Sequence, residues 1–336
     1  MVEKKEFISV VIPCYQEKNH IESCLQSVVD QTYGQENYEV IVVDGMSTDG
    51  TREIIQSYVE KYPNVTWLDN EQHITPVAMN LGIKAAKGDY VIRLDAHSSV
   101  PSNYIERCWD VMQTTGSDVV GGAIETQGKG FWGKLIAYVL TSVFGVGTSF
   151  RTLTNYSGYV DTLAFGLYKK KDLLDVGLHD EGLKRGQDWD LNHKIRKRGG
   201  KIFLDSSIRP VYYCAESPIK FLKKSFRDGY WIASIFEKRS FRHLVPFFFV
   251  MSIIGLAGAC YWRRHNAGPL SWVFFPLWGY LSIYLLVAFF YSLGMVRKSG
   301  WIALIFGPLL YASFHISRGL GTLYGLLTGV WLHAER

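Results

Sequence analysis

Short apolar runs alternate with helix-like segments along the first half of the chain. FISVVIP at 7–13, YEVIVVDG at 38–45 and YVIRLD at 90–95 are apolar, β-branched stretches typical of buried strands. A helical segment at 76–86 precedes the last of them, and VTWLD at 65–69 is a shorter strand. Because strands that are joined through helices run parallel, the pattern predicts an α/β fold with a doubly wound, mostly parallel sheet.

The pattern changes at about residue 244. Residues 244–262 carry no charge, and neither do residues 267–296, so we predict two membrane-spanning helices at about 244–262 and 270–295. We therefore divide the chain into an α/β domain over 1–243 and a membrane domain over 244–336.

A third apolar run, at 301–318, is less regular. His315 and Arg318 interrupt it, and an apolar, glycine-rich C-terminal segment follows. Two alternatives remain for residues 301–332: one tilted span, or a span followed by an interfacial piece.

Two segments before residue 151 have special composition. FWGKLIAYVLTSVFGVGTSF at 131–150 is apolar and aromatic but holds Lys134 and several glycines, which favours an interfacial segment, with a buried core helix as the alternative. SDVVGGAIET at 117–126 predicts another strand, in which Gly121 and Gly122 permit another part of the chain to approach the backbone.

Cysteine usage and charge narrow the functional class. The 5 cysteines are scattered without a CxxC pair, which favours a reducing compartment and neither a disulfide framework nor a zinc site. The net charge of +5 does not come from basic patches with interleaved aromatics, so we expect no nucleic-acid partner, and a membrane or phosphate partner is favoured.

Basic residues also predict the orientation in the membrane. A cluster precedes the first predicted span: Lys220, Lys223, Lys224, Arg227, Lys238, Arg239 and Arg242. By the positive-inside rule this places the α/β domain in the cytoplasm. The charged start, MVEKKEF, leads straight into a strand, so we expect no secretory signal peptide. The prediction is a multi-pass protein of the inner (plasma) membrane.

The strand at 90–95 ends in a candidate metal site. Asp95 and His97 are two residues apart, and a strand period of two would place both side chains on one face. A carboxylate and an imidazole there are suited to one divalent cation, Mn²⁺ or Mg²⁺. For the DxH motif alone, the alternative is an Asp that caps the next turn and a His on the polar surface.

A nucleotide-dependent dehydrogenase is the obvious rival for such a fold. After the first strand, however, PCYQEKN lacks the glycines of a dinucleotide-binding turn, and the chain has no GxxxxGK[ST] motif. A cation at Asp95 and His97 would neutralise a diphosphate without a glycine-rich loop.

Four motifs in order along the chain carry a family resemblance. VVIPCYQE at 10–17, VVDGMSTDGT at 42–51, RLDAHS at 93–98 and GQDWDLNHKIRKRGGKI at 186–202 resemble the family 2 glycosyltransferases with a GT-A fold. DAH stands where most relatives carry DAD, and in this the chain is similar to membrane-anchored enzymes of succinoglycan-type exopolysaccharide synthesis. The resemblance implies inverting transfer of a sugar from a nucleotide-diphosphate sugar, with UDP favoured.

The resemblance also implies a set of donor-binding residues. They are Pro13, Tyr15, Glu17, Asp44, Ser47, Asn80, Arg93 and Asp95. Asp44 is expected to accept a hydrogen bond from the base or ribose. The plain alternatives are a turn at 13–17, a helix cap at 44–51 and a solvent-facing Asn80, while Arg93 either meets a phosphate or pairs with a neighbouring acid.

The later motifs supply the base and the acceptor side. Asp188 and Asp190 are separated by about 200° around a helix, so they cannot both face the cleft, and the family motif selects Asp188 as general base. Gln187 stands where most relatives carry Glu. The residues assigned to the acceptor side are Asp161, Thr162, Gln187, Trp189, Arg227 and Trp231. For Arg227 and Trp231, the alternative is a place at the membrane surface.

The membrane domain predicts the class of acceptor. A soluble sugar would need no anchor, so we expect a polyprenyl-diphosphate-linked saccharide at the bilayer surface, and too few spans are predicted for a polymer channel. A polyprenyl-phosphate sugar synthase is the alternative enzyme. A non-catalytic nucleotide-sugar-binding membrane scaffold is the third hypothesis, disfavoured because Asp95, His97 and Asp188 are all present.

Overall fold

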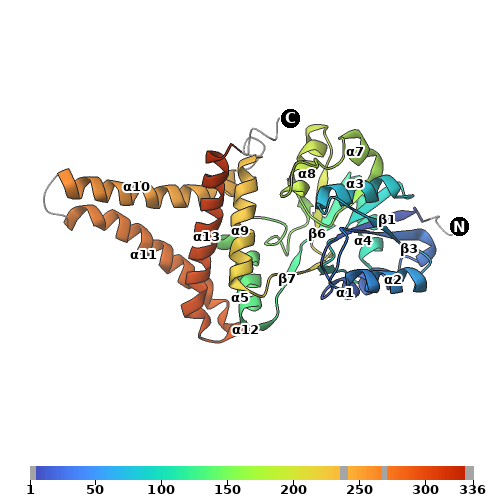
Figure 1. Ribbon diagram of the computed structural model, residues 1–336, viewed down its shortest axis with the longest axis horizontal. Helices are drawn as coiled ribbons and strands as arrows, with labels where there is room; N and C mark the ends of the chain where they lie inside the picture. The colour runs from blue at the N-terminus through green and yellow to red at the C-terminus, as the bar shows by residue number, and fades with distance from the viewer. Residues whose placement is uncertain (1–4, 235–240, 267–270, 330–336) are drawn as a thin grey trace. The chain divides into compact units, whose positions relative to one another are not determined.

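The chain forms two compact units. The computed structural model describes residues 5–234, 241–266 and 271–329 (Figure 1). The first unit comprises Met1–Glu125 and Thr148–Tyr213, and the second comprises Thr126–Gly147 and Cys214–Arg336. Residues 126–147 and 214–243, which the sequence pattern placed in the α/β domain, thus group with the C-terminal helices. Lys238 and Arg239 of the predicted basic cluster lie outside the described residues.

The first unit is built on an eight-stranded sheet with the order β3-β2-β1-β4-β9-β6-β10-β8. The strands are β1 (Ile8–Cys14), β2 (Tyr38–Asp44), β3 (Val65–Asp69), β4 (Tyr90–Arg93), β6 (Val119–Gly122), β8 (Gly158–Tyr159), β9 (Leu167–Lys169) and β10 (Ile202–Asp205). Neighbours among β3, β2, β1 and β4 run parallel, as do β6 and β10, whereas β8 and β9 run antiparallel to their neighbours. The predicted α/β architecture with a mostly parallel sheet is confirmed.

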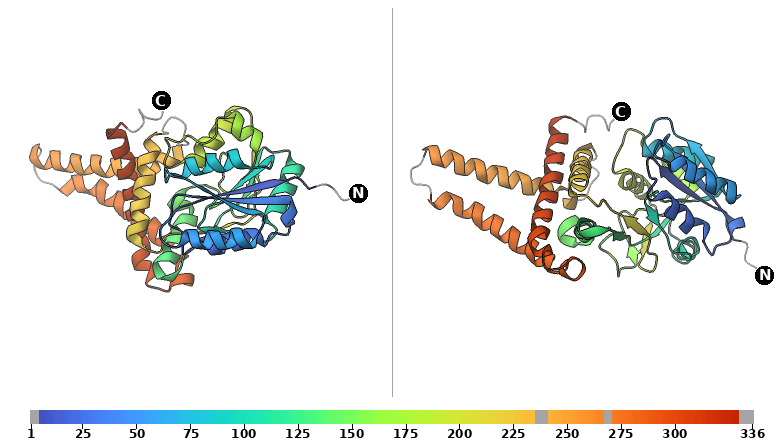
Figure 2. Two further views of the ribbon diagram at one scale, coloured as in Figure 1. Left: turned by 45° about the vertical axis from the view of Figure 1, so that its right-hand side comes forward. Right: turned by 60° about the horizontal axis from the view of Figure 1, so that its bottom comes forward.

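Helices cover both faces of this sheet (Figure 2). They are α1 (Ile21–Val29), α2 (Thr51–Lys61), α3 (Thr75–Ala85), α4 (Tyr104–Thr115), α7 (Lys170–Asp175) and α8 (Gln187–Lys197), with a 3₁₀ turn η1 (Gln35–Asn37). Val11 of β1 and Val43 of β2 are fully buried in one apolar cluster with Met79 and Ile83 of α3. This packing explains why β1 and β2 read as unbroken apolar runs in the sequence.

The strand that precedes the predicted metal motif is shorter than expected. β4 ends at Arg93, so Asp95 and His97 lie on the turn between β4 and β5 (Ser98–Ser99) and not on a strand face. The period-two argument for their shared orientation is therefore wrong. The turn is held differently: β5 lies in a small sheet with the order β5-β11-β7, made with β11 (Val211–Tyr213) and β7 (Glu125–Gln127), and the Tyr213 amide donates to the His97 carbonyl over 3.0 Å.

The second unit is helical. Its elements are α5 (Gly130–Thr141), α6 (Val143–Val146), α9 (Pro218–Ser234), η3 (Phe241–Leu244), α10 (Val245–Asn266), α11 (Ser271–Leu293), α12 (Val296–Ser299) and α13 (Ala303–Leu327). Helices α9 and α13 lie side by side (Figure 1). The Thr322 hydroxyl of α13 donates to the Gly229 carbonyl of α9 over 3.0 Å. The run that begins near residue 301 forms one continuous helix as far as Leu327.

Two helices of this unit are long and apolar enough to cross a membrane: Val245–Asn266, and Phe275–Leu293 within α11. Only 17% and 11% of their most apolar windows are buried within the structure, unlike a core helix of a soluble protein. Their exposed apolar surface requires an apolar environment, and lipid provides one. The chain is therefore membrane-associated.

The segment 131–150 forms the two short helices α5 and α6, which lie in the second unit, and its last residues, 148–150, belong to the first unit. Leu135, Ile136 and Val139 of α5 are fully buried, and the Tyr311 hydroxyl of α13 donates to the Ser142 hydroxyl over 2.7 Å. One face of this segment is thus part of the core of the unit, as in the buried-helix alternative.

Gly122 provides a test of the packing of the first unit. A Cβ atom at Gly122 would overlap the backbone of Ile208, so this position of β6 has room for glycine only. The Gly-Gly pair predicted such a close approach of another part of the chain. We expect Gly122→Ala to lower the free energy of unfolding by at least about 1–3 kcal/mol, the usual penalty for overpacking. Thermal unfolding of the full-length protein in detergent measures this.

Gly255→Ala is the matched control. Gly255 lies inside α10, where no described atom lies within 4 Å of an added Cβ, and alanine favours a helix by about 1 kcal/mol over glycine. This variant should unfold at or above the wild-type temperature. Equal midpoints for both variants would contradict the close contact at Gly122.

Candidate active site

Three loops at the carboxyl edge of the sheet have unusual backbone conformations. Gln16, Met46 and His73 follow β1, β2 and β3 in sequence, and each has a positive φ, of 56°, 58° and 56° respectively. Such a conformation in a non-glycine residue costs on the order of 1–3 kcal/mol and is concentrated at functional sites. The strain thus marks the edge of an open α/β sheet at which ligands bind.

Asp44 organises the loop after β2. The side chain is fully buried, and its Oδ1 and Oδ2 accept from the Ser47 hydroxyl and amide over 2.6 and 2.9 Å. Arg52 of α2 lies 3.3 Å from Oδ2 and also pairs with Asp69 at the end of β3. Through Arg52, Asp44 therefore links the ends of β2 and β3. Sequence reasoning missed Arg52.

The loop after β1 is held by side chains of the next loop. The amides of Gln16, Glu17 and Lys18 donate to the Ser47 hydroxyl, the Thr51 hydroxyl and the Asp49 carboxylate over 2.8, 2.9 and 3.2 Å. These bonds satisfy backbone donors of residues 16–18, which precede α1.

Two further residues of this edge were assigned to the donor. Pro13 lies in β1, one residue before its end, and Tyr15 is 49% exposed. The Tyr15 ring lies 5.6 Å from that of His73, whose Nδ1 lies 2.5 Å from the Gly45 carbonyl oxygen. Sequence reasoning missed His73, for which the chain carries no recognisable motif.

Arg93 joins the two carboxylates that the sequence singled out. This buried arginine lies at the end of β4, and its Nη2 donates to Oδ1 of Asp95 over 3.0 Å. Its Nη1 contacts Oδ1 of Asp188, in the first turn of α8. The fold thus brings together two candidate site residues that are far apart in sequence, and it realises the alternative in which Arg93 pairs with an acid.

His97 is oriented by Glu17. The two side chains are 2.8 Å apart, between Nδ1 and Oε1. An ionised carboxylate only accepts hydrogen bonds, so Nδ1 carries the proton, which leaves Nε2 toward other partners. Burial alone would lower the pKa of His97, but the hydrogen bond with Glu17 and the negative charge of Asp95 outweigh burial and raise this pKa.

The two aspartates of α8 have separate partners. Asp190 is 1% exposed and pairs with Lys194 over 2.9 Å, whereas Asp188 contacts Arg93. This agrees with the rotation expected between residues two apart on a helix. Asp190 is thus part of the internal packing of α8.

Asn80 fastens a loop instead of facing solvent. Its amide oxygen accepts from the His179 amide over 3.0 Å, and its Nδ2 donates to the His179 carbonyl and to Glu181, each over 2.9 Å. Through this clamp, α3 fixes the segment that leads toward α8. His179 itself is buried, and its Nδ1 has no hydrogen-bond partner in the described part of the chain.

Three residues assigned to the acceptor side have structural contacts. Thr162 is buried and accepts from Asn192 of α8 over 3.0 Å, a link that sequence reasoning missed. Trp189 is 6% exposed and stacks on His193, with centroids 5.0 Å apart. The side-chain Nε2 of Gln187 donates to the Lys184 carbonyl over 2.9 Å.

The other three acceptor-side residues are placed as follows. Asp161 lies next to Thr162 and is partly buried. Arg227 and Trp231 lie on α9 in the second unit.

Comparisons with known proteins agree with this geometry. The family model described as Glycosyl transferase family 2 matches residues 9–173, which include β1, β2, β4 and the Asp95–His97 turn. A dolichyl N-acetyl-α-D-glucosaminyl phosphate 3-β-D-2,3-diacetamido-2,3-dideoxy-β-D-glucuronosyltransferase of Methanococcus voltae is 27% identical over 333 residues, 96% of this chain and 98% of the relative. Succinoglycan biosynthesis protein ExoA of Rhizobium meliloti is 32% identical over 206 residues, 61% of this chain and 62% of that protein.

Solved structures show the same fold. The mannosyltransferase PcManGT from Pyrobaculum calidifontis, in complex with GDP-Man and Mn²⁺, superposes with a TM-score of 0.66 at 16% identity, covering 96% of this chain and 88% of that one. Staphylococcus aureus TarS 1–349 in complex with UDP has a TM-score of 0.51 at 19% identity, over 95% and 92% of the two chains. The expected GT-A fold is confirmed.

The buried His179 predicts a pH dependence of stability. Burial, and then the charges of Arg93 and Lys194, lower the pKa of His179 to about 3, far below its unfolded value. The unfolded chain therefore binds a proton that the folded chain does not, and stability falls as the pH drops below about 6.5. Between pH 7 and pH 5 the loss is about 2 kcal/mol.

His179→Leu should remove this loss, so that its unfolding free energy decreases by about 2 kcal/mol less than that of wild type over the same interval. Chemical unfolding of the full-length protein at the two pH values measures it. His265→Leu, which changes an exposed histidine of α10, should follow wild type. The prediction fails if the two variants respond alike.

Proposed function

Because the chain belongs to the family 2 glycosyl transferases, we propose that it moves one sugar from a nucleotide-diphosphate sugar, UDP-linked, to a hydroxyl of a lipid-linked saccharide, with inversion at the anomeric carbon. The observation that carries this proposal is the contact of Arg93 with both Asp95 and Asp188. It brings Asp95, a carboxylate suited to a metal ion that would meet the donor diphosphate, and Asp188, a carboxylate suited to the acceptor hydroxyl, to one end of the sheet.

The strained loops after β1 and β2 bind the nucleotide in this proposal. Tyr15 is the exposed ring of that edge, and Pro13 and Glu17 flank it. Asp44 and Ser47 hold the shape of the loops through their hydrogen bonds. Asn80 does not contact the nucleotide in this proposal; it holds the loop at 179–181 in place through its hydrogen bonds to His179.

Asp95 and His97 would hold the divalent metal, Mn²⁺ or Mg²⁺. Two observations fit this: Asp95 lies close enough to His97 for its charge to act on the imidazole, and Glu17 fixes the His97 tautomer with Nε2 available. A ligating histidine typically donates its other N–H to a carboxylate in this way. No group of three or more His, Cys, Asp or Glu side chains suited to a metal occurs in the described residues, and Asp95 and His97 would be the two ligands that the chain supplies. When bound, the ion neutralises charge on the departing diphosphate.

Asp188 takes the proton of the acceptor hydroxyl. Its Oδ1 contacts Arg93, which leaves Oδ2 for the hydroxyl. The arginine and the positive end of α8 both favour the ionised carboxylate, so the base is ready at neutral pH. One carboxylate is sufficient for a direct, inverting displacement, because no covalent intermediate has to form. Asp161, Thr162, Gln187 and Trp189 lie toward the acceptor in this proposal.

The acceptor is presented at a membrane. The two exposed apolar helices anchor the enzyme, as a multi-pass protein of the inner (plasma) membrane with the first unit in the cytoplasm. The name of the Methanococcus voltae relative specifies a sugar that is already attached to dolichyl phosphate, which supports a lipid-linked saccharide as the acceptor. Arg227 and Trp231, on the amphipathic α9, would serve this side of the reaction.

Removal of the metal tests the donor site. We expect EDTA to abolish release of UDP from the sugar donor, Mn²⁺ or Mg²⁺ to restore it, and Asp95→Ala to remain inactive with either ion. Glu17→Gln keeps both ligands but loses the charge that orients His97, so the metal concentration for half-maximal activity should rise roughly 10–100-fold. Full turnover in chelator would overturn the assignment.

Asp188→Asn tests the base. Turnover should fall roughly 10²–10⁴-fold, the usual contribution of a positioned base, while the affinity for the nucleotide sugar stays within a few-fold of wild type. Kinetics with a lipid-linked saccharide, and the anomeric configuration of the product by NMR, measure this.

Asp190→Asn is the matched control. It breaks the buried pair with Lys194 and should lower stability, but turnover per folded molecule should change much less than in Asp188→Asn. The proposal is wrong if the large loss of turnover occurs at Asp190 and not at Asp188, or if the product retains the anomeric configuration of the donor.

A further inference from the structure

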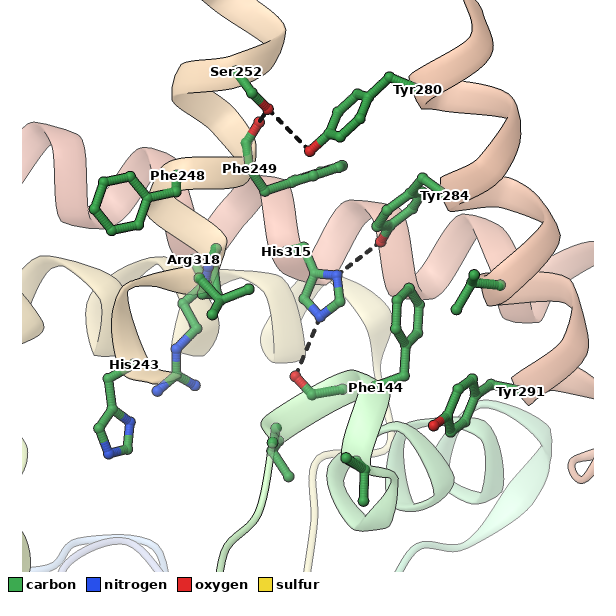
Figure 3. A pocket seen from close by; sticks show the side chains of 17 residues that line it. Phe144, His243, Phe248, Phe249, Ser252, Tyr280, Tyr284, Tyr291, His315 and Arg318 are labelled. Atoms are coloured by element: carbon green, nitrogen blue, oxygen red, sulfur yellow. Dashed lines mark hydrogen bonds between the residues drawn. The ribbon is translucent and has the colours of Figure 1, made fainter. Parts of the chain in front are cut away.

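The second unit contains a cavity among its helices. Its volume is about 770 Å³, within the range of ~300–1,000 Å³ typical of small-molecule sites. The wall is formed by α6 with the residue that follows it, η3, α10, α11 and α13 (Figure 3). All of these elements belong to the second unit.

One end of the cavity is cationic and the rest is aromatic. Figure 3 shows the Arg318 guanidinium and the His243 ring at the same end. The opposite part is lined by aromatic rings that contact one another. Phe249 and Tyr284 stack with centroids 4.4 Å apart, and Phe144 packs on Tyr291 at 5.3 Å.

Ser252, Tyr280, Tyr284 and His315, in the aromatic part, have hydrogen-bond partners within the wall. Ser252 donates to the Tyr280 hydroxyl over 2.9 Å, and the Tyr284 hydroxyl lies 2.8 Å from Nδ1 of His315. Nε2 of His315 lies 3.2 Å from the Gly145 carbonyl oxygen. Because these groups bond to one another, this part of the cavity presents mainly apolar surface and suits an apolar chain.

Arg318 differs from these groups. Among residues 5–234, 241–266 and 271–329, no carboxylate lies within 4.0 Å of its guanidinium, although the charge of Asp228 acts on it from farther away. Its guanidinium lies 5.9 Å from the ring centroid of Phe314. Arg318 thus lines the cavity next to the two apolar helices α10 and α11, and a charged side chain beside such apolar surroundings commonly marks a binding site. A guanidinium suits a phosphate in particular, because it donates two parallel hydrogen bonds.

We propose that this cavity binds the phosphate-bearing end of a polyprenyl-phosphate or polyprenyl-diphosphate lipid. Arg318 and His243 contact the phosphate, and the first isoprenoid units lie against Phe144, Phe249 and Tyr284. The rest of the chain lies in the bilayer along the exposed faces of α10 and α11. The inference rests on the proposed function in one respect only, the choice of a lipid-linked acceptor.

The shape of the site favours one slender chain over a two-chain phospholipid. Val287 and Phe248 are 37% and 45% exposed while they line the cavity, so the cavity is open at its side toward the apolar surroundings of α10 and α11. A single chain is able to leave through such an opening, whereas two acyl chains and a glycerol group need more volume near the head.

Photolabelling locates the site. The full-length protein in detergent is labelled with a polyprenyl phosphate that carries a photoreactive group near the phosphate, and labelled peptides are mapped by mass spectrometry. We expect label on η3, α10 and α13, and competition by unlabelled polyprenyl phosphate. Neutral polyprenol, phosphatidylglycerol and inorganic phosphate should each compete at least 10-fold less well.

Arg318→Gln should weaken binding of polyprenyl phosphate on the order of 10–100-fold, because a charge-assisted contact is lost, and should leave binding of polyprenol unchanged. Arg263→Gln, at an exposed position on α10, is the matched control and should bind like wild type. Val287→Trp fills the apolar part and should weaken binding of both lipids. It provides a test even if Arg318→Gln does not fold.

Several outcomes would overturn the proposal. They are equal competition by polyprenol or phosphatidylglycerol, label confined to other segments, or wild-type affinity in both Arg318→Gln and Val287→Trp. Binding of UDP-sugar and sugar transfer are measured on the same samples. Transfer to a lipid-linked saccharide that is unchanged in both variants rejects the cavity but keeps the proposed function. Intact, Arg318-dependent lipid binding without any sugar transfer rejects the proposed function but keeps the cavity.

Discussion

The first unit depends on one buried cation. Arg93 is almost inaccessible to solvent, and a guanidinium in such a place is stable only if its charge is compensated. Asp95 and Asp188 provide that compensation, and so the arginine fixes the turn after β4 and the start of α8 against each other. Burial, and in second place the positive charge of Arg93, lower the pKa of His179 and so keep its ring neutral. An arrangement that solves a problem of stability thereby also sets the geometry of the candidate site.

Backbone strain at the same edge has a similar explanation. Gln16, Met46 and His73 adopt left-handed conformations that an isolated loop would leave, and they persist because neighbouring loops hold them. Ser47 and Asp44 provide this hold for the first two loops. The loop after β1, PCYQEKN, is not glycine-rich, and a rigid edge of this kind offers exposed groups such as Tyr15 at fixed positions.

Local pattern predicted the elements of this chain well and predicted its contacts less well. β1, β2 and β3 begin and end within one residue of the predicted segments. For β1 and β2 the reason is that strands buried on both faces need unbroken apolar sequence, whereas β3 is only partly buried. The helical period also placed Asp188 and Asp190 on different sides of α8, because the rotation between residues two apart is a local property of a helix. The Glu17–His97 pair and the Asn80 clamp were not predictable, since each joins residues that are distant in sequence and carry no shared pattern. The end of β4 at Arg93 was missed because the apolar Leu94 continues the run, and its amide still donates to the Val11 carbonyl of β1 over 3.1 Å.

The boundary between the two units also differs between what hydropathy predicts and what the packing of the helices shows. Hydropathy placed a boundary near residue 243, yet α9, which precedes it, packs on α13, at the far end of the sequence. Glycines make this possible: a Cβ atom at Gly229 would overlap the Arg318 backbone, and one at Gly321 would overlap that of Phe226. Small residues that let two helices approach closely are a device of helix packing within membranes. The glycine-rich sequence after residue 318 is therefore best understood as a helix–helix interface, and α13 uses this face for α9 while α10 and α11 keep the exposed apolar surface.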